Sequence, residues 1–425
     1  MNYKKKTLKN GLRIITIPMK DNNTATALVL VEAGSKYENK KNNGISHFLE
    51  HMCFKGTTNR PKPGDISHEL DALGAQSNAF TSHEFTGYYA KAHSKQTSKL
   101  IDIISDLYLN PIFNDAEIEK EKGVIIEEIN MYQDLPMRDI YDLFMNLLYG
   151  DKPAGWNIAG PKEVVKSINK KDFEDYRGKH YVASATTVVV AGNIDEKEVI
   201  KEIENKFKDV SVDKHHKKEK VKEKQLSPQI KIKNKKLDQT HLVLGTRAFD
   251  LFKKDAQIVS VIAGVLGKGM SSRLFHKLRE EMGCCYYVRA ENNTFTDHGF
   301  FNIASGVDKN RVEEVVKVLL EEIKKIKTDL VSDVELKKVK EYLIGNLFLE
   351  LESSDAFAEF YGVQEILNKP ISNPKEKAKR IKEITSQDIK RVANKIFKNE
   401  NLNLAIIGDI DKKQESNLKK ILKFN

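Results

Sequence analysis

Two histidines and a glutamate lie together in the segment 44–56, in a spacing that suits metal chemistry. His47 and His51 are four residues apart, so on a helix their side chains point the same way, one turn apart. Glu50 is three residues after His47 and shares that face. Imidazole rings bind metal ions, and a carboxylate beside a metal can act as a general base. The segment therefore predicts a helix that carries a metal site and a catalytic base.

The two histidines leave a catalytic zinc site one protein ligand short, because such sites usually have three protein ligands and a water. The segment 121–131 predicts a helix with isoleucine anchors and three glutamates, Glu121, Glu127 and Glu128. Glu127 and Glu128 are adjacent, so on a helix they point about 100° apart. Glu121 and Glu128 are seven residues apart and share a face. These residues alone leave the choice of ligand open, and they also fit a solvated charged helix.

The segment 47–57 resembles the His-x-x-Glu-His motif of the inverted-zinc metallopeptidases, a superfamily that includes pitrilysin, insulin-degrading enzyme and mitochondrial processing peptidase. The continuation over 54–57 resembles the short, two-domain, processing-peptidase-like branch. Glu128 follows His51 by 77 positions, which matches the place of the family's third ligand. The resemblance implies one Zn²⁺ per chain with His47, His51 and Glu128 as its ligands. It implies Glu50 as the catalytic base and Glu121 as a residue that supports the site. Glu127 stays a minor alternative to Glu128.

The segment 76–82 resembles the edge strand on which members of this family lay their peptide substrates. An extended peptide can add to an exposed strand through backbone hydrogen bonds, which gives affinity with little demand on its sequence. The resemblance implies that substrates bind in this way at Asn78, Ala79 and Phe80. From the residues alone, Asn78 equally fits an ordinary strand end.

In the second half of the chain, the segments 269–275 and 278–286 resemble the family's second-domain signature. Arg279 and Tyr286 are seven residues apart, like the Arg–Tyr pair of the family. The resemblance implies that both are catalytic and bind the substrate carbonyl and the developing oxyanion. From the residues alone, Arg279 fits a surface ion pair and Tyr286 a half-buried strand position. The apolar spacing over 271–282 predicts an α-helix before that strand.

The elements that must position these residues form two halves with one plan. Each half closes with an apolar run followed by Gly-x-Ile-Asp, and the glycines of the two runs, Gly192 and Gly408, are 216 residues apart. A repeat of half the chain length indicates a duplicated domain. In each half, strands precede helices. This order predicts an α+β fold of two homologous domains, each a mostly antiparallel sheet with helices packed on one face.

A lysine-rich stretch near the middle of the chain, residues 211–228, predicts an exposed linker. It separates an N-terminal zinc-binding peptidase domain, 1–210, from a C-terminal domain without metal, 229–425. The resemblance implies that these two domains form half of a clamshell chamber.

Composition and charge suit a globular protein. The 425 residues are 40% hydrophobic and 31% charged, and no apolar run reaches the ~18 residues that a membrane span needs. The net charge of +10 fits an anionic partner or a lysine-rich surface. Lysines spread along the whole chain without a nucleic-acid motif, which favours the surface and predicts no nucleic-acid partner. Three cysteines and a start without a signal sequence predict a cytoplasmic location.

These observations predict a zinc metalloendopeptidase that hydrolyses unfolded peptides or oligopeptides, presequence-like ones included, inside an enclosed chamber. The alternative is an inactive or partner-dependent subunit of a processing-peptidase-like heteromer, which would bind substrate as a scaffold. Inactive relatives usually lack a ligand or the base, whereas this chain keeps both, so the enzyme is favoured. Relatives of this length usually pair, which implies a homodimer.

Overall fold

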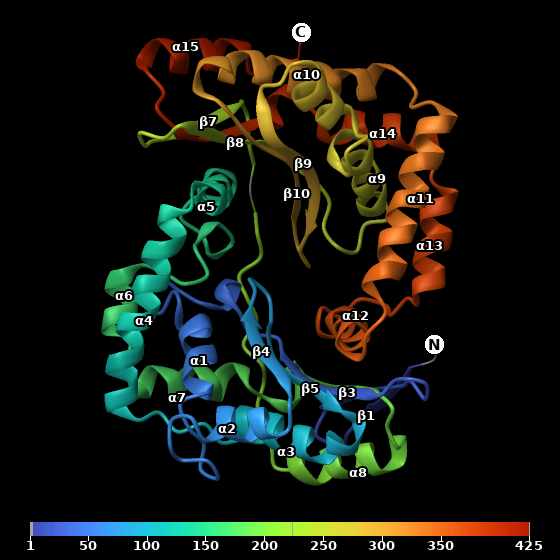
Figure 1. The fold of residues 1–425 in the computed structure, drawn as a ribbon. Helices are drawn as coiled ribbons and strands as arrows, with labels where there is room; N and C mark the ends of the chain where they lie inside the picture. Colours follow the sequence, from blue (N-terminus) through green and yellow to red (C-terminus); the bar gives the residue numbers. More distant parts are fainter. Residues whose placement is uncertain (1–2, 223, 425) are drawn as a thin grey trace. The chain divides into compact units, whose positions relative to one another are not determined.

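The computed structural model describes residues 3–222 and 224–424 of the chain (Figure 1). The chain folds into two compact units, each assembled from three separate segments. Unit 1 consists of Met1–Asn130, Trp156–Glu219 and Leu349–Asn373, and unit 2 of Met131–Gly155, Lys220–Phe348 and Pro374–Asn425. Each unit thus contains a short segment from the other half of the chain. The contiguous domain boundaries inferred from the sequence do not include this exchange and stay a prediction.

Unit 1 contains a six-stranded sheet in the order β1-β2-β6-β3-β5-β4, so β4 is an edge strand. The strands β2 and β6 are parallel, and the other neighbours are antiparallel. The strands are β1 (Lys4–Thr7), β2 (Arg13–Pro18), β3 (Thr24–Val31), β4 (Gln76–Thr81), β5 (Thr86–His93) and β6 (Thr186–Gly192). The predicted segment 76–82 therefore lies at the edge of a sheet.

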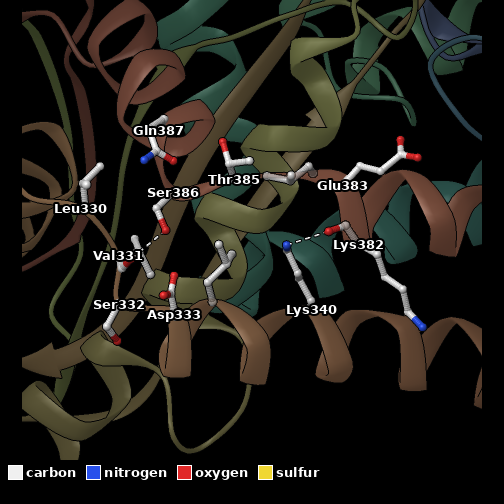
Figure 2. A pocket seen from close by; sticks show the side chains of 12 residues that line it. Leu330, Val331, Ser332, Asp333, Lys340, Lys382, Glu383, Thr385, Ser386 and Gln387 are labelled. Carbon is white, nitrogen blue, oxygen red and sulfur yellow. Dashed lines mark hydrogen bonds between the residues drawn. The ribbon is translucent and has the colours of Figure 1, made fainter.

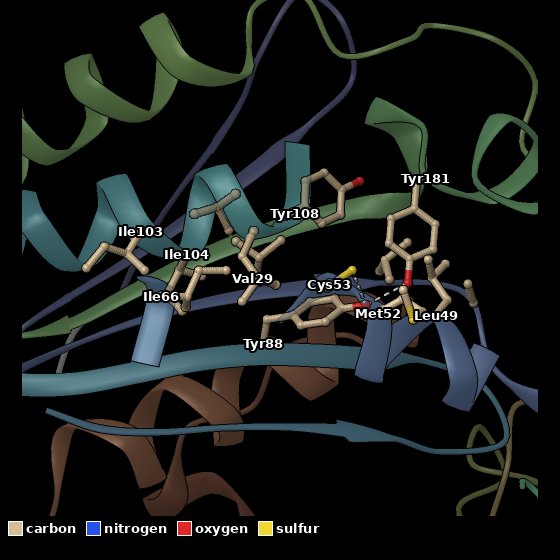
Figure 3. Packing of buried hydrophobic residues seen from close by; sticks show 14 of the residues in the cluster. Val29, Leu49, Met52, Cys53, Ile66, Tyr88, Ile103, Ile104, Tyr108 and Tyr181 are labelled. Atoms are coloured by element: carbon tan, nitrogen blue, oxygen red, sulfur yellow. Dashed lines mark hydrogen bonds between the residues drawn. The ribbon is translucent and has the colours of Figure 1, made fainter. Parts of the chain in front are cut away.

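Two hydrophobic cores cover the two faces of this sheet, because successive residues of a strand point to opposite sides. On β3, Val29 and Val31 join the first core, which includes residues of α1, α3 and α7, while Leu28 and Leu30 join the second. Figure 3 shows the first core around Tyr88, whose hydroxyl lies 2.9 Å from that of Tyr181. The second core is covered by α12, which comes from the chain's second half.

The helices of unit 1 lie mainly between the strands in sequence. They are α1 (Ile45–Cys53), α2 (Asp65–Ala72), α3 (Thr97–Leu109), α4 (Asp115–Asp134), α6 (Lys162–Ser167), α7 (Lys170–His180), α8 (Glu196–Phe207) and α12 (Ser354–Ile366). The last residues of α4 belong to unit 2.

Unit 2 repeats the topology of unit 1. Its five strands are β7 (Gln229–Asn234), β8 (Gln239–Arg247), β9 (Cys285–Thr294), β10 (Gly299–Asp308) and β11 (Asn403–Gly408). Their order, β7-β11-β8-β10-β9, matches β2-β6-β3-β5-β4, and in both sheets only the first pair of these five is parallel. The equivalent strands β6 and β11 end at Gly192 and Gly408. The α+β class and the homologous halves are therefore confirmed.

The helices of unit 2 also cover both faces of its sheet, whereas the sequence predicted helices on one face, because each sheet also receives a helix from the other half of the chain. They are α5 (Pro136–Tyr149), α9 (Asp255–Gly267), α10 (Val312–Thr328), α11 (Asp333–Glu350), α13 (Pro374–Glu383), α14 (Ser386–Ile396) and α15 (Lys412–Ile421). Residues of α9, α10 and α14 form one core. On the other face, Phe144 and Leu148 of α5, from the chain's first half, pack with residues such as Val243 and Ala405.

The repeat extends to helix starts. The helix α7 begins with a capping box formed by Asn169 and Asp172, and α14 begins with one formed by Thr385 and Asp388. Each box satisfies two backbone N–H groups that a helix end would leave unpaired. Both pairs are 216 residues apart, the same offset as the two strand-ending glycines. No helix among the described residues combines the length and apolarity that a membrane crossing requires.

The linker has no regular structure over residues 211–222, but side chains of its first part contact other residues of unit 1. The His215 ring lies 5.3 Å from the Tyr37 ring and 5.6 Å from the buried His180 ring, measured between centroids. Lys218 Nζ donates to the Tyr37 hydroxyl at 3.2 Å. A lysine- and histidine-rich stretch is thus attached to the folded surface through ring contacts.

Candidate metal centre

The helix α1 is amphipathic, and its polar face carries the predicted chemistry. Phe48, Leu49, Met52 and Cys53 are buried in the first core of unit 1. Figure 3 shows Leu49, Met52 and Cys53 in this core. Since that face is committed to packing, the opposite face presents the partly buried His47, Glu50 and His51.

The start of α1 is fixed by Glu38. This buried carboxylate accepts hydrogen bonds from the backbone N–H groups of Gly44 and Ser46, each at 2.8 Å. A negative charge at a helix N-terminus also interacts favourably with the helix dipole. Gly44 has φ of 101°, and a Cβ there would clash with the carbonyl oxygen of Ala159, so the turn requires glycine.

Three predicted ligands converge. His47 Nε2 and His51 Nε2 each lie 3.5 Å from Glu128 Oε2. Ligand atoms of these three residues all lie within 4.8 Å of one another, and this is the only such group of three or more metal-ligating side chains among the described residues. Burial by itself lowers the pKa of His47, but the hydrogen bond and charge of Glu128 raise it overall. The donor set of two imidazoles and a carboxylate fits zinc.

Glu121 lies behind this cluster. Its Oε1 lies 2.9 Å from His51 Nδ1, and its Oε2 lies 2.7 Å from Lys55 Nζ. Burial raises the pKa of the Glu121 carboxyl, but the hydrogen bonds from His51 and Lys55 lower it overall, so the group is a carboxylate. When this carboxylate accepts a hydrogen bond from Nδ1–H of His51, the lone pair of Nε2 is free to face the cluster.

Adjacent glutamates of α4 have different surroundings. Glu128 is partly buried in the cluster, whereas Glu127 is exposed and accepts a hydrogen bond from Asn130 Nδ2 at 3.2 Å. The helical rotation of ~100° between neighbours explains the difference.

Glu50 is held by a residue that the sequence analysis did not assign. Thr81 Oγ1, at the end of β4, donates to Glu50 Oε2 at 2.5 Å. Burial raises the pKa of Glu50, and the hydrogen bond from Thr81 lowers it in part. Alternation along β4 places Thr81 on the same face as Ala79, but the sequence does not show that this face meets α1.

The three predicted substrate residues lie on the edge strand β4 and differ in exposure. Asn78 is exposed, and its Oδ1 accepts a hydrogen bond from the Ala79 N–H at 2.9 Å. Ala79 packs against the first core, whereas Phe80 packs against the second core and forms an edge-to-face contact with Phe85. The Phe80 ring also covers Gly87, where a Cβ would clash with it.

Arg279 and Tyr286 belong to unit 2 and contact each other. Arg279 lies in a π-helical segment, Phe275–Glu281, in place of the α-helix predicted over 271–282. Its guanidinium donates to the Tyr286 carbonyl and lies 5.1 Å from the centre of the Tyr286 ring. The Tyr286 side chain itself is 68% exposed. The π-helix is a rare form of helix.

Unit 2 also contains a surface pocket of about 580 Å³ between the starts of α11 and α14 (Figure 2). Two of the polar groups that line it bond to the surrounding backbone. Lys340 Nζ donates to the Lys382 carbonyl at 2.8 Å, and Ser386 Oγ donates to the Val331 carbonyl at 2.7 Å. The pocket contains none of the predicted site residues.

Comparisons with known proteins find peptidase relatives along the chain. A family model described as Insulinase (Peptidase family M16) matches residues 13–162, and one described as Peptidase M16 inactive domain matches residues 167–343. The chain is 36% identical to an "Uncharacterized zinc protease" of Rickettsia felis, over 96% of this chain and 98% of that protein. It is 31% identical to the mitochondrial-processing peptidase subunit beta of Mus musculus, over 96% of this chain and 85% of that protein.

Solved structures share the fold. A protease from Helicobacter pylori superimposes with a TM-score of 0.87 at 23% identity, covering 96% of this chain and 99% of that one. A peptidase M16 inactive domain from Pseudomonas fluorescens superimposes with a TM-score of 0.89 at 17% identity, covering 97% and 99%.

The two family models follow one another along the chain, as the duplicated halves do, and the relatives match over nearly its full length. The first model spans the three clustered side chains, and the second spans Arg279 and Tyr286. The chain therefore belongs to the insulinase family of peptidases, M16, in its short two-domain branch.

Proposed function

We propose that this protein is a zinc-dependent endopeptidase that hydrolyses unfolded peptides. The observation that carries the proposal is the convergence of His47, His51 and Glu128 in one group of ligand atoms. Two histidines and a carboxylate are a donor set of catalytic zinc sites. Relatives named as zinc proteases, which match over nearly the whole chain, support the same activity.

Glu50 is the proposed general base. Zinc at the three ligands would polarise the scissile carbonyl and make a water acidic enough to be deprotonated near neutral pH. Glu50 lies on the same helix face as the histidines, so its carboxylate would take the water proton and pass it to the nitrogen of the leaving amine. Glu121 would keep His51 in the tautomer that ligates through Nε2.

The edge strand β4 is the proposed peptide site. An outer strand has backbone groups that no neighbouring strand pairs, and an extended peptide can pair with them. The proposal places the substrate along Asn78, Ala79 and Phe80. The side chains of Ala79 and Phe80 pack inward, so backbone bonding would dominate there, and sequence selectivity would be low.

The remaining parts of the proposal concern the second domain and assembly. Arg279 and Tyr286 would stabilise the oxyanion by charge and by hydrogen bonding. An enclosed chamber would admit unfolded peptides and exclude folded proteins by size. We further propose a homodimer, with one Zn²⁺ in each chain.

Cleavage of a quenched fluorescent peptide by the purified chain tests the proposal. Glu50→Gln should keep its zinc and lose about 10²–10⁴-fold in kcat, the range of general base catalysis. Glu127→Gln, an exposed change in the same unit, is the matched control. Cleavage by Glu50→Gln at the parent rate, or full activity in protein freed of zinc, would contradict the proposal.

A substrate-binding scaffold is the second candidate, because one relative is a subunit by name and the second family model is described as inactive. The same assay separates the two candidates. Activity of the chain alone supports the enzyme. Activity that arises only when a second protein is added supports the scaffold.

A further inference from the structure

Thr81 connects the edge strand to the proposed base. It is the last residue of β4, and its hydroxyl donates to Glu50 Oε2 at 2.5 Å. Alternation places Ala79 and Thr81 on one face of the strand and Phe80 on the other. Ala79 packs against the core that contains α1, which agrees with Thr81 reaching a side chain of that helix.

The chain that follows Thr81 is anchored on both sides. The Ser82 N–H donates to the Phe85 carbonyl at 2.9 Å, which closes the hairpin between β4 and β5. The Lys36 N–H donates to the His83 carbonyl at 2.9 Å, and a Cβ at Gly34 would clash with the Ser82 carbonyl oxygen. A hairpin fixed to the backbone of 34–36 gives Thr81 a defined position.

We propose that Thr81 is the positioning residue for Glu50: its hydroxyl holds one carboxylate oxygen so that the other is directed at the reacting water. This inference rests on the proposed peptidase function. A peptide paired along β4 would then lie on the strand whose last residue holds the base. Binding and proton transfer would share one rigid element, which keeps the reacting atoms in register.

Three single variants test whether Thr81 positions Glu50. Thr81→Val keeps the shape and removes the donor, so kcat should fall by about 10²-fold, the cost of a slightly misplaced catalytic group. KM should stay within about twofold, because peptide binding uses the strand backbone. Thr81→Ser restores the hydroxyl and should restore most of kcat. Thr58→Val, the same change at an exposed position of unit 1 outside β4, is the matched control and should leave kcat unchanged.

Two measurements separate positioning from a structural role. Zinc content and melting temperature of Thr81→Val should equal those of the parent. In the Glu50→Gln background, Thr81→Val should cause no further loss of kcat, since the residue it positions has already been changed. Binding of a labelled peptide, followed by fluorescence anisotropy, should be the same for Glu50→Gln with and without Thr81→Val.

The failures of the two proposals differ. Parent-like kcat in Thr81→Val, beside an inactive Glu50→Gln, would overturn the positioning role and leave the peptidase standing. Loss of zinc or a large drop in melting temperature in Thr81→Val would also overturn it, in favour of a structural role. Parent-like activity of Glu50→Gln would remove the proposed function and this inference with it.

Discussion

The Nδ1 of His51 lies 2.9 Å from Glu121 Oε1, and the same carboxylate holds Lys55 Nζ through its other oxygen at 2.7 Å. Such a carboxylate fixes the imidazole orientation and makes its other nitrogen a better ligand. Glu121→Ala should therefore weaken zinc binding by about 10–100-fold, as loss of this kind of partner usually does. Competition with a chelator measures the affinity. Glu119→Ala, at an exposed position of α4, is the control, and equal affinity in both variants would contradict the role of Glu121.

Glu128 and Glu127 offer a test in which neighbouring residues of one helix give opposite results. Glu128→Gln removes the carboxylate from the cluster, so the purified protein should contain much less zinc. Glu127→Gln changes an exposed side chain that accepts a hydrogen bond from Asn130 and should keep full zinc. Elemental analysis of both proteins after dialysis measures their zinc content. Loss of zinc in Glu127→Gln but not in Glu128→Gln would show that Glu127 is the ligand.

Gly44 and Gly123 should respond oppositely to alanine. Gly44→Ala places a Cβ at a positive φ and against the Ala159 carbonyl, so α1 should lose its start and the protein much of its stability. Gly123 lies inside α4 with no atom near an added Cβ, so Gly123→Ala should stabilise by up to about 1 kcal/mol. Thermal unfolding of the two variants measures both effects. A Gly44→Ala protein as stable as the parent would contradict the requirement for glycine in this turn.

Stability should depend on pH through His180. Burial, together with the charges of His215, His216 and Lys179, lowers the pKa of His180 to about 3 from its ordinary 6.5. The folded state therefore keeps His180 neutral, while the unfolded chain binds a proton there below pH 6.5. The stability from this residue is present above pH 6.5 and is lost as the pH falls towards 3.

Removing the imidazole should flatten this dependence. Between pH 7.5 and 5.5 the parent should lose about 1.4 kcal/mol more than His180→Phe, as the linkage relation gives for such a shift. Tyr37, Tyr176, Glu32 and Lys218 also lie around this ring cluster, so the slopes of parent and variant are compared, not their absolute stabilities. Urea titrations at both pH values measure the slopes, with His68→Gln on the exposed side of α2 as control. Identical slopes in parent and His180→Phe would contradict the assignment.

Local patterns in the sequence predicted the site helix and the edge strand well. The bounds of β4, Gln76–Thr81, agree with the expected strand, and α1 carries His47 and His51 on one face as spacing required. The residues alone left the choice between Glu127 and Glu128 open. Helix geometry shows that the two side chains point in different directions, but not which of them faces α1.

Contacts between distant segments were less predictable. The helix α5 comes from the chain's first half but belongs to unit 2, and an apolar stripe does not reveal which sheet a helix covers. The π-helical turn around Arg279 was missed because apolar residues at helical spacing fit an α-helix equally well. Thr81 was missed because a threonine near a strand end has no signal of its own until the facing helix is known.

The position of α12 in the sequence sets the order in which unit 1 folds. Phe357 and Tyr361 fill the second core of unit 1 together with Leu28, Leu30 and Val189, yet they are made after nearly all of the rest of that unit. A ribosome therefore releases His47, His51 and Glu128 long before their sheet has both of its faces covered. Unit 1 therefore completes its folding late in translation, and until α12 is made the nascent chain exposes an apolar sheet face that other proteins such as chaperones must cover.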